Sequence, residues 1–161
     1  MSDYASAAVR GIDGPIPDGK LVIVASRYNA EICDALVDGA ARTLSAAGIA
    51  EDRVSVVRIP GAWELPLACR YLLPSEPIGI VALGCVIKGE TTHDEHINRG
   101  VSLHLMRMSV RTGIPIGFGL LTCNTQEQAL ARAGGRVGNK GEETASAVLE
   151  MLRLKAKLQK V

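Results

Sequence analysis

Hydrophobic residues follow two alternating patterns along this chain. Short, almost continuous apolar runs are typical of strands buried on both faces, and longer segments with apolar residues three or four positions apart are typical of helices. The strand pattern covers residues 21–25, 54–59, 78–83 and 115–121. The helical pattern covers residues 29–47, 64–73, 92–111, 125–135 and 142–159.

Capping and turn residues mark the ends of the predicted helices. Asn29 is the predicted N-cap of the first helix, and Gly48 ends it. Thr125-Gln-Glu-Gln128 fits a capping box that opens the fourth helix, which we expect to end near residues 134–135. Gly138-Asn-Lys-Gly141 then predicts a turn and a cap before the last helix.

Strands that alternate with helices predict right-handed crossovers and a parallel sheet covered on both faces. The predicted fold class is therefore α/β, a three-layer α/β/α sandwich with a four-stranded parallel sheet and flavodoxin-like winding. Residues 1–19, rich in Gly and Pro, predict an extended N-terminal arm, and residues 20–161 predict a single domain. In such sheets, ligands bind beyond the carboxyl ends of the strands.

Composition and charge narrow the partners of the chain. Of its 161 residues, 47% are hydrophobic and 3% are aromatic, and the formal net charge is +1. This balance lacks the basic surface of nucleic-acid-binding proteins. The longest strongly apolar stretch, residues 78–87, is too short to span a bilayer, and the N-terminus lacks the pattern of a signal peptide. We therefore expect a cytoplasmic protein without a nucleic-acid or membrane partner.

The cysteines predict free thiols rather than a metal or redox motif. No two of them form a C-x-x-C pair, which argues against a zinc site and against thioredoxin-type chemistry. In the cytoplasm such thiols stay reduced. They are Cys33, Cys69, Cys85 and Cys123.

Residues that core packing does not explain gather directly after the predicted strands. The segments that contain them are 26–29, 60–66, 84–93 and 122–125. The second segment holds the only tryptophan, Trp63, beside Glu64. An aromatic ring next to a carboxylate suits a planar heterocycle with N–H donors. A structural tryptophan that packs over a helix start explains the same pair equally well.

The third segment ends at a predicted helix N-terminus, where free backbone N–H groups and hydroxyls form a natural phosphate cradle. Glu90, Thr91 and Thr92 lie there, and His93 follows as a residue type that exchanges protons near neutral pH. Helix-capping threonines and a surface histidine are the structural alternative. A metal site made by Glu90, His93 and His96 is a third interpretation, for which the spacing is weak evidence.

Two positively charged residues farther along the chain can each be explained by a structural role. Arg132 lies in the last turn of the fourth predicted helix, where the helix dipole favours a positive charge. Lys140 belongs to the predicted turn and cap at residues 138–141. Neither residue indicates a binding site by itself.

Taken together, these segments resemble the lumazine synthases. The likeness covers about residues 21–155, in the order and with the spacing of the family. The segments that carry it are Arg27-Tyr-Asn29, Pro60-Gly-Ala-Trp-Glu-Leu-Pro66, Gly84-Cys-Val-Ile-Lys-Gly-Glu-Thr-Thr-His93, Gly119-Leu-Leu-Thr-Cys-Asn-Thr-Gln-Glu-Gln-Ala-Leu-Ala-Arg-Ala-Gly134 and Gly138-Asn-Lys-Gly141. Each segment alone is of modest specificity, but the ordered set is highly specific.

The resemblance implies an enzyme that condenses 5-amino-6-(D-ribitylamino)uracil with 3,4-dihydroxy-2-butanone 4-phosphate. The product is 6,7-dimethyl-8-ribityllumazine, in the penultimate step of riboflavin biosynthesis. An imine forms, phosphate leaves, and ring closure follows. Because the reactants supply most of the reactivity, the protein positions them, moves protons and neutralises the phosphate. The resemblance implies small-molecule substrates and neither a metal nor an organic cofactor.

The resemblance also implies roles for individual residues. His93 matches the proton-transfer residue of the family. The residues implied on the uracil side are Tyr28, Ala62, Trp63, Glu64, Cys85, Val86, Ile87 and Phe118. The residues implied on the phosphate side are Glu90, Thr91, Arg132 and Lys140. In the family each site lies between neighbouring subunits, with Phe118, Arg132 and Lys140 matching positions that face the others across the interface.

One stretch departs from the family pattern. After the histidine, the family usually continues with an aromatic residue, an acid and often Tyr. This chain has Asp94-Glu95-His96 instead, so Glu95 keeps the acid and both flanking aromatics are absent. The packing around His93 is therefore expected to differ from that of typical members.

The resemblance implies a homo-oligomer, either a pentamer or a shell of twelve pentamers, and association with riboflavin synthase. Pentamer-only members often carry extra residues between the last two helices. The link at residues 133–141 is short and lacks an insertion, so we expect a 60-subunit shell, with the pentamer as the alternative. Against the shell, Pro15 and Pro17 lack backbone donors, which weakens any strand that the arm adds to a neighbouring subunit.

Two functions of other classes compete with the enzyme. The first is a shell-forming paralogue without activity, and the intact His93, Thr91, Glu64 and Arg132 argue against this loss. The second is a flavodoxin-like carrier of a nucleotide or flavin. Against it, no Gly-rich or Ser/Thr-rich phosphate loop follows the first predicted strand.

Overall fold

Four parallel strands form the central sheet of the structure, a computed structural model that describes residues 8–160. The strands are β1 (Leu21–Ser26), β2 (Val54–Ile59), β3 (Gly79–Ile87) and β4 (Ile116–Cys123). Their order is β2-β1-β3-β4, and every neighbouring pair is parallel. The predicted sheet and its flavodoxin-like winding are therefore confirmed.

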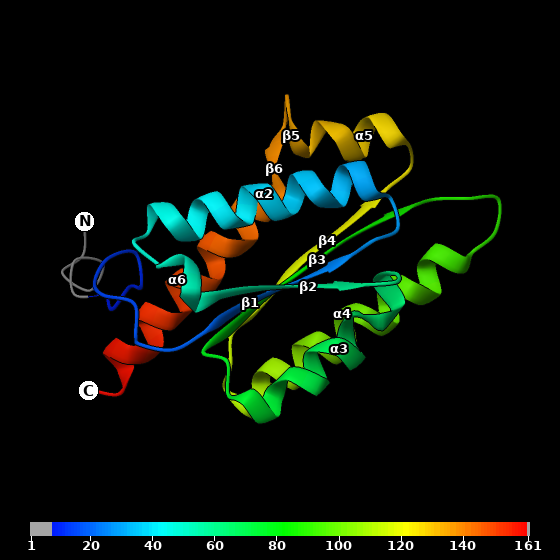
Figure 1. Ribbon diagram of the computed structural model, residues 1–161. Coiled ribbons are helices and arrows are strands. Elements are labelled where there is room, and N and C mark those ends of the chain that lie inside the picture. The colour runs from blue at the N-terminus through cyan, green and yellow to red at the C-terminus, as the bar shows by residue number, and fades with distance from the viewer. Residues whose placement is uncertain (1–7, 161) are drawn as a thin grey trace.

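Helices cover both faces of the sheet, which completes the predicted three-layer α/β/α sandwich. One face carries α2 (Ala30–Ala46) and α6 (Lys140–Leu158), and the other carries α3 (Leu65–Leu72) and α4 (His93–Thr112), as Figure 1 shows. A shorter helix, α5 (Gln126–Ala131), follows β4 at the carboxyl end of the sheet. Single turns of 3₁₀ helix lie at η1 (Glu51–Arg53), η2 (Ala62–Glu64) and η3 (Leu73–Ser75).

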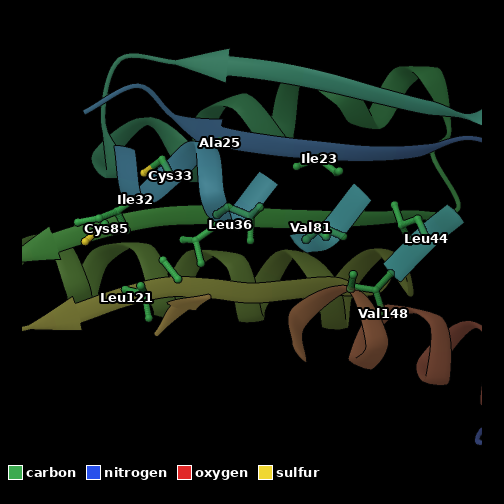
Figure 2. Packing of buried hydrophobic residues seen from close by; sticks show 14 of the residues in the cluster. Ile23, Ala25, Ile32, Cys33, Leu36, Leu44, Val81, Cys85, Leu121 and Val148 are labelled. Atoms are coloured by element: carbon green, nitrogen blue, oxygen red, sulfur yellow. The ribbon is translucent and has the colours of Figure 1, made fainter. Parts of the chain in front are cut away.

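Two hydrophobic cores lie on opposite faces of the sheet. Because side chains alternate along a strand, Ile23 of β1 packs beneath α2 and α6, whereas Val24 packs beneath α3 and α4. Figure 2 shows the first core, in which Ile23 and Val81 of the sheet meet Leu36 of α2. Aliphatic side chains fill both cores, in agreement with the low aromatic content.

The helix after β4 ends earlier than the sequence predicts. α5 stops at Ala131, and the link to α6 forms a small antiparallel hairpin of β5 (Ala133–Gly135) and β6 (Gly138–Asn139). Gly134 and Gly138 take φ values of 107° and 103°, which side chains other than glycine rarely adopt. The glycines that we expected to end the helix therefore bend the chain into a hairpin instead.

The described part of the predicted arm, residues 8–19, forms no helix or strand and lies against its own chain. Lys157 of α6 donates to the carbonyl of Arg10 at 2.7 Å and pairs with Asp13. Farther along, Arg53 donates to the carbonyl of Pro17 at 2.7 Å. Residues 1–7 of the arm lie outside the described residues. Over residues 8–160, no helix has the length and apolarity needed to cross a membrane.

Candidate active site

A cavity of about 460 Å³ opens at the carboxyl ends of β1 and β3. The strand order reverses between these two strands, and α/β sheets of this type bind ligands at such a reversal. We call this cavity the crevice. Its lining residues are Tyr28, Asn29, Gly61, Ala62, Trp63, Cys85, Val86, Ile87, Gly89, Thr91, His93, Asp94 and Ile97.

The loop between β1 and α2 presents Tyr28 to the crevice. The backbone N–H of Tyr28 donates to the carbonyl of Pro60 at 3.2 Å, and Asn29 Nδ2 donates to the carbonyl of Cys85 at 3.0 Å. These bonds tie the loop to the ends of β2 and β3, and Tyr28 lines the crevice with 72% of its surface exposed. The side chain of Asn29 does not cap α2, because the residue takes a left-handed conformation with φ 55° and points to β3. The predicted N-cap at Asn29 is therefore confirmed, and its backbone carbonyl rather than its side chain accepts the first hydrogen bonds of α2.

The segment after β2 supplies an apolar wall and an aromatic ring. Ala62 is buried, and Trp63 lines the crevice with 59% of its surface exposed. Glu64 is absent from the lining. One of its carboxylate oxygens, Oε2, accepts the backbone N–H of Gly61 at 3.0 Å and closes the turn before α3. In this chain the Glu64 carboxylate therefore holds the segment that carries Trp63.

The segment between β3 and α4 brings a hydroxyl and an imidazole to the rim of the crevice. His93 is the first residue of α4, so it lies where the helix leaves backbone N–H groups without intrahelical partners. Thr91 Oγ1 accepts the N–H of His93 at 3.4 Å, which agrees with a capping role for this hydroxyl. Both residues are exposed and line the crevice, whereas Glu90 is exposed and does not.

The thiol of Cys85 forms part of the crevice floor and stays neutral. Burial raises its pKa to about 12, and the neighbouring thiols Cys33 and Cys123 add to this effect. A protonated thiol is a poor nucleophile. Cys85 therefore contributes an apolar, polarisable surface rather than covalent chemistry. Across the described residues, all four cysteines are free, as predicted, and all four are buried.

Three predicted site residues lie away from the crevice of their own chain. Arg132 and Lys140 line a separate cavity of about 230 Å³ beside β4, where Lys140 pairs with Glu143 at 2.9 Å. Phe118 of β4 lines neither cavity and is 45% exposed. Within the described chain, the crevice lining contains no lysine or arginine. Within one chain, Tyr28 and Trp63 in the crevice are therefore separated from Arg132 and Lys140.

The metal-site interpretation of Glu90, His93 and His96 gains no support from the geometry. Residues 8–160 contain no group of three or more His, Cys, Asp or Glu side chains arranged to hold a metal ion. His93 and Asp94 both line the crevice, but Glu90 and His96 are exposed outside its lining.

Several lining residues were not predicted from the sequence. Asp94 and Ile97 follow His93 on α4, and Ile97 lies four residues along on the same helix face, a spacing that could have indicated it. Asp94 Oδ1 is buried and has no hydrogen-bond partner among the described residues. Gly61 and Gly89 line the crevice through their backbone, for which residue type gives no signal.

Comparison with known proteins gives one consistent result. Residues 18–156 match the model of the 6,7-dimethyl-8-ribityllumazine synthase family. A 6,7-dimethyl-8-ribityllumazine synthase of Rhodopirellula baltica is 58% identical over 94% of this chain and 99% of its own length. Proteins of the same name from Xanthomonas campestris and Stenotrophomonas maltophilia are each 49% identical over 84% of this chain and 88% of their own lengths.

Proposed function

Because the chain belongs to the 6,7-dimethyl-8-ribityllumazine synthase family, we propose that the crevice is the place where it carries out this family's reaction. The chain condenses 5-amino-6-(D-ribitylamino)uracil with 3,4-dihydroxy-2-butanone 4-phosphate and releases phosphate and water. The observation that carries the assignment of the crevice is the meeting of two aromatic side chains with a helix N-terminus that holds a histidine.

The uracil binds in the part of the crevice formed by β1, β3 and η2. Tyr28 and Trp63 offer ring faces to a planar heterocycle, and their exposure leaves these faces free for a ligand. Ala62, Cys85, Val86 and Ile87 provide a neutral floor that excludes water. Glu64 acts on this side through its bond to Gly61, which fixes the segment that bears Trp63.

His93 moves protons during the condensation. The amine of the uracil attacks the ketone, and one water is lost as the imine forms. Phosphate then leaves, and attack of the ribitylamino nitrogen on the remaining carbonyl closes the ring with loss of a second water. Each loss needs a proton at the departing oxygen, and an exposed imidazole at the rim of the crevice can deliver it. The backbone at Glu90 and the hydroxyl of Thr91 hold the phosphate at the N-terminus of α4, which favours an anion.

The phosphate also needs cations, and these come from a neighbouring subunit. The crevice lining of the described chain has none, while Arg132 and Lys140 lie beside β4 together with the exposed Phe118. A shared site therefore requires an oligomer. Apolar side chains that remain exposed on α4 support assembly, because Leu103, Met106 and Val110 recur at helical spacing with 47%, 65% and 74% exposure.

The oligomer that we propose is a shell of 60 subunits built from pentamers. The link between α5 and α6 is a hairpin without an insertion, the form that the resemblance associates with shells. Riboflavin synthase is the proposed protein partner of this assembly. Light scattering and negative-stain microscopy test the shell, since a homogeneous particle of five subunits across pH and phosphate concentration would contradict it and leave the enzyme assignment intact.

Direct assay tests the reaction itself. The purified protein is mixed with both substrates, and the absorbance and fluorescence of the lumazine are followed over time. Reactions that lack either substrate serve as controls and correct for the uncatalysed condensation. We expect product to form faster than in the control without protein. Equal rates with and without protein would contradict the function.

A further inference from the structure

A glycine in the middle of α4 lies against the ring of Trp63. A Cβ atom built on Gly100 would come within 3.0 Å of Trp63 Cζ3 and 3.6 Å of Cη2. Glycine destabilises a helix interior relative to alanine, because it gives up more backbone freedom on folding. Local helix stability therefore does not explain this residue, whereas the close approach of the indole does.

Gly100 belongs to the helix face that lines the crevice. His93, Ile97 and Gly100 are spaced by four and then three residues, so they lie along one face of α4. His93 and Ile97 line the crevice, and the Trp63 ring continues the same wall beyond them. The missing side chain at position 100 gives the ring a place to lie against the helix backbone.

The contact also fixes which edge of the indole faces the helix. The nearest ring atoms, Cζ3, Cη2 and Cε3, all belong to the six-membered ring. The Nε1 edge is on the opposite side of the indole, so it points away from α4. Only the benzo edge of Trp63 is held by this contact, while 59% of the residue remains exposed to a ligand or solvent.

We propose that Gly100 is a positioning residue for the uracil. By lacking a side chain, it lets the Trp63 ring lie close to α4 and so sets the distance between this ring and the crevice floor. The inference rests on the proposed role of the crevice. An added methyl group would push the ring outward by a few tenths of an ångström, and the exposed ring has room to move without unfolding the chain.

The variant Gly100→Ala tests the proposal in the assembled protein. Displacing one stacking ring should raise KM for the uracil about three- to tenfold, while kcat and KM for the keto-phosphate change much less. Trp63 is the only tryptophan, so its fluorescence emission should shift in the variant without any label. The melting temperature should not fall, because alanine favours the helix. Ser102→Ala, two residues along α4, is the matched control and should change neither emission nor KM.

A double-mutant cycle separates positioning from a general effect on the helix. In a Trp63→Phe background the shorter ring no longer reaches position 100, so adding Gly100→Ala should leave KM unchanged. If Gly100→Ala alone fails to assemble because the ring clashes, the double variant should assemble.

Three results would overturn the proposal. They are unchanged emission together with unchanged KM in Gly100→Ala, an equal rise in KM in both backgrounds, and failure of the double variant to assemble. A wild-type protein that makes no lumazine would instead overturn the function, and the emission shift would still report on the contact.

Discussion

The crevice and the outer edge of the sheet at β4 divide the chemistry of the predicted site between them. The crevice lies at β1 and β3, the two inner strands, and contributes aromatic rings, a neutral thiol and a helix N-terminus. The β4 edge contributes Phe118, Arg132 and Lys140. Inner strands are covered by helices, where an unpaired charge is costly, whereas an edge leaves cations in water. The comparison supports our proposal that one chain carries two half-sites, which are joined between neighbouring copies.

The largest loss of activity should come from a substitution in the crevice. We expect His93→Ala to lower kcat by about 10²–10⁴-fold, the usual contribution of a general acid–base group. The protein should still fold, because His93 is exposed and packs against no core. Steady-state rates and a thermal melt measure the two effects. A variant with wild-type kcat at saturating substrate would mean that another group moves the protons.

Mixing two impaired variants gives the sharpest test of the two half-sites. His93→Ala and Arg132→Ala subunits are unfolded together and reassembled at equal amounts, then assayed at low keto-phosphate. If each site joins His93 of one subunit to Arg132 of the next, about a quarter of the sites regain both residues. The mixture should exceed the His93→Ala parent by on the order of 25-fold or more. No gain over the average of the parents would locate both residues in one subunit.

The third prediction concerns the β4 edge alone. Arg132→Ala should raise KM for the keto-phosphate about tenfold or more, because a charge-assisted hydrogen bond contributes roughly 1.5–3 kcal/mol. KM for the uracil should change much less, since the crevice that binds it is intact. Lys140→Ala is a companion variant to Arg132→Ala. It removes the second cation of the β4 edge, whose side chain pairs with Glu143 in the free chain. Equal weakening of both substrates by Arg132→Ala would make Arg132 a structural residue.

The fold was predictable because each signal was local. All four strands match their apolar runs, although β3 and β4 each extend farther toward the crevice, to Ile87 and Cys123. The hairpin after α5 was missed because Gly134 and Gly135 end a helix as readily as they make a turn, and only the pairing with residues 138–139 decides between these outcomes. Backbone pairing of this kind leaves no periodic pattern in the sequence.

The sequence predicted several residues that line the crevice, but it did not predict the hydrogen bonds of Asn29 and Glu64. The rule that ligands bind at the carboxyl ends of strands located Tyr28, Trp63 and His93, and the structure brings all three to the crevice. Asn29 and Glu64 show the limit, because each forms a hydrogen bond that depends on another segment or on the exact turn. The spacing of residues in the sequence indicates which polar side chains belong to the site, but not which donor or acceptor each of them bonds.

The smallest expected effect concerns Glu64, and it tests whether the charge of this side chain contacts the uracil or only holds the turn before α3. Its carboxylate accepts the Gly61 N–H, so Glu64→Gln keeps an acceptor oxygen and loses only the charge. We expect Glu64→Gln to stay within about twofold of wild-type activity, since the side-chain bond survives. Glu64→Ala should loosen the turn, lower the stability by about 1 kcal/mol and raise KM for the uracil through the displaced Trp63. If Glu64→Gln raises this KM as much as Glu64→Ala, the charge itself contacts the uracil, and Glu64 turns into the crevice when the substrate binds.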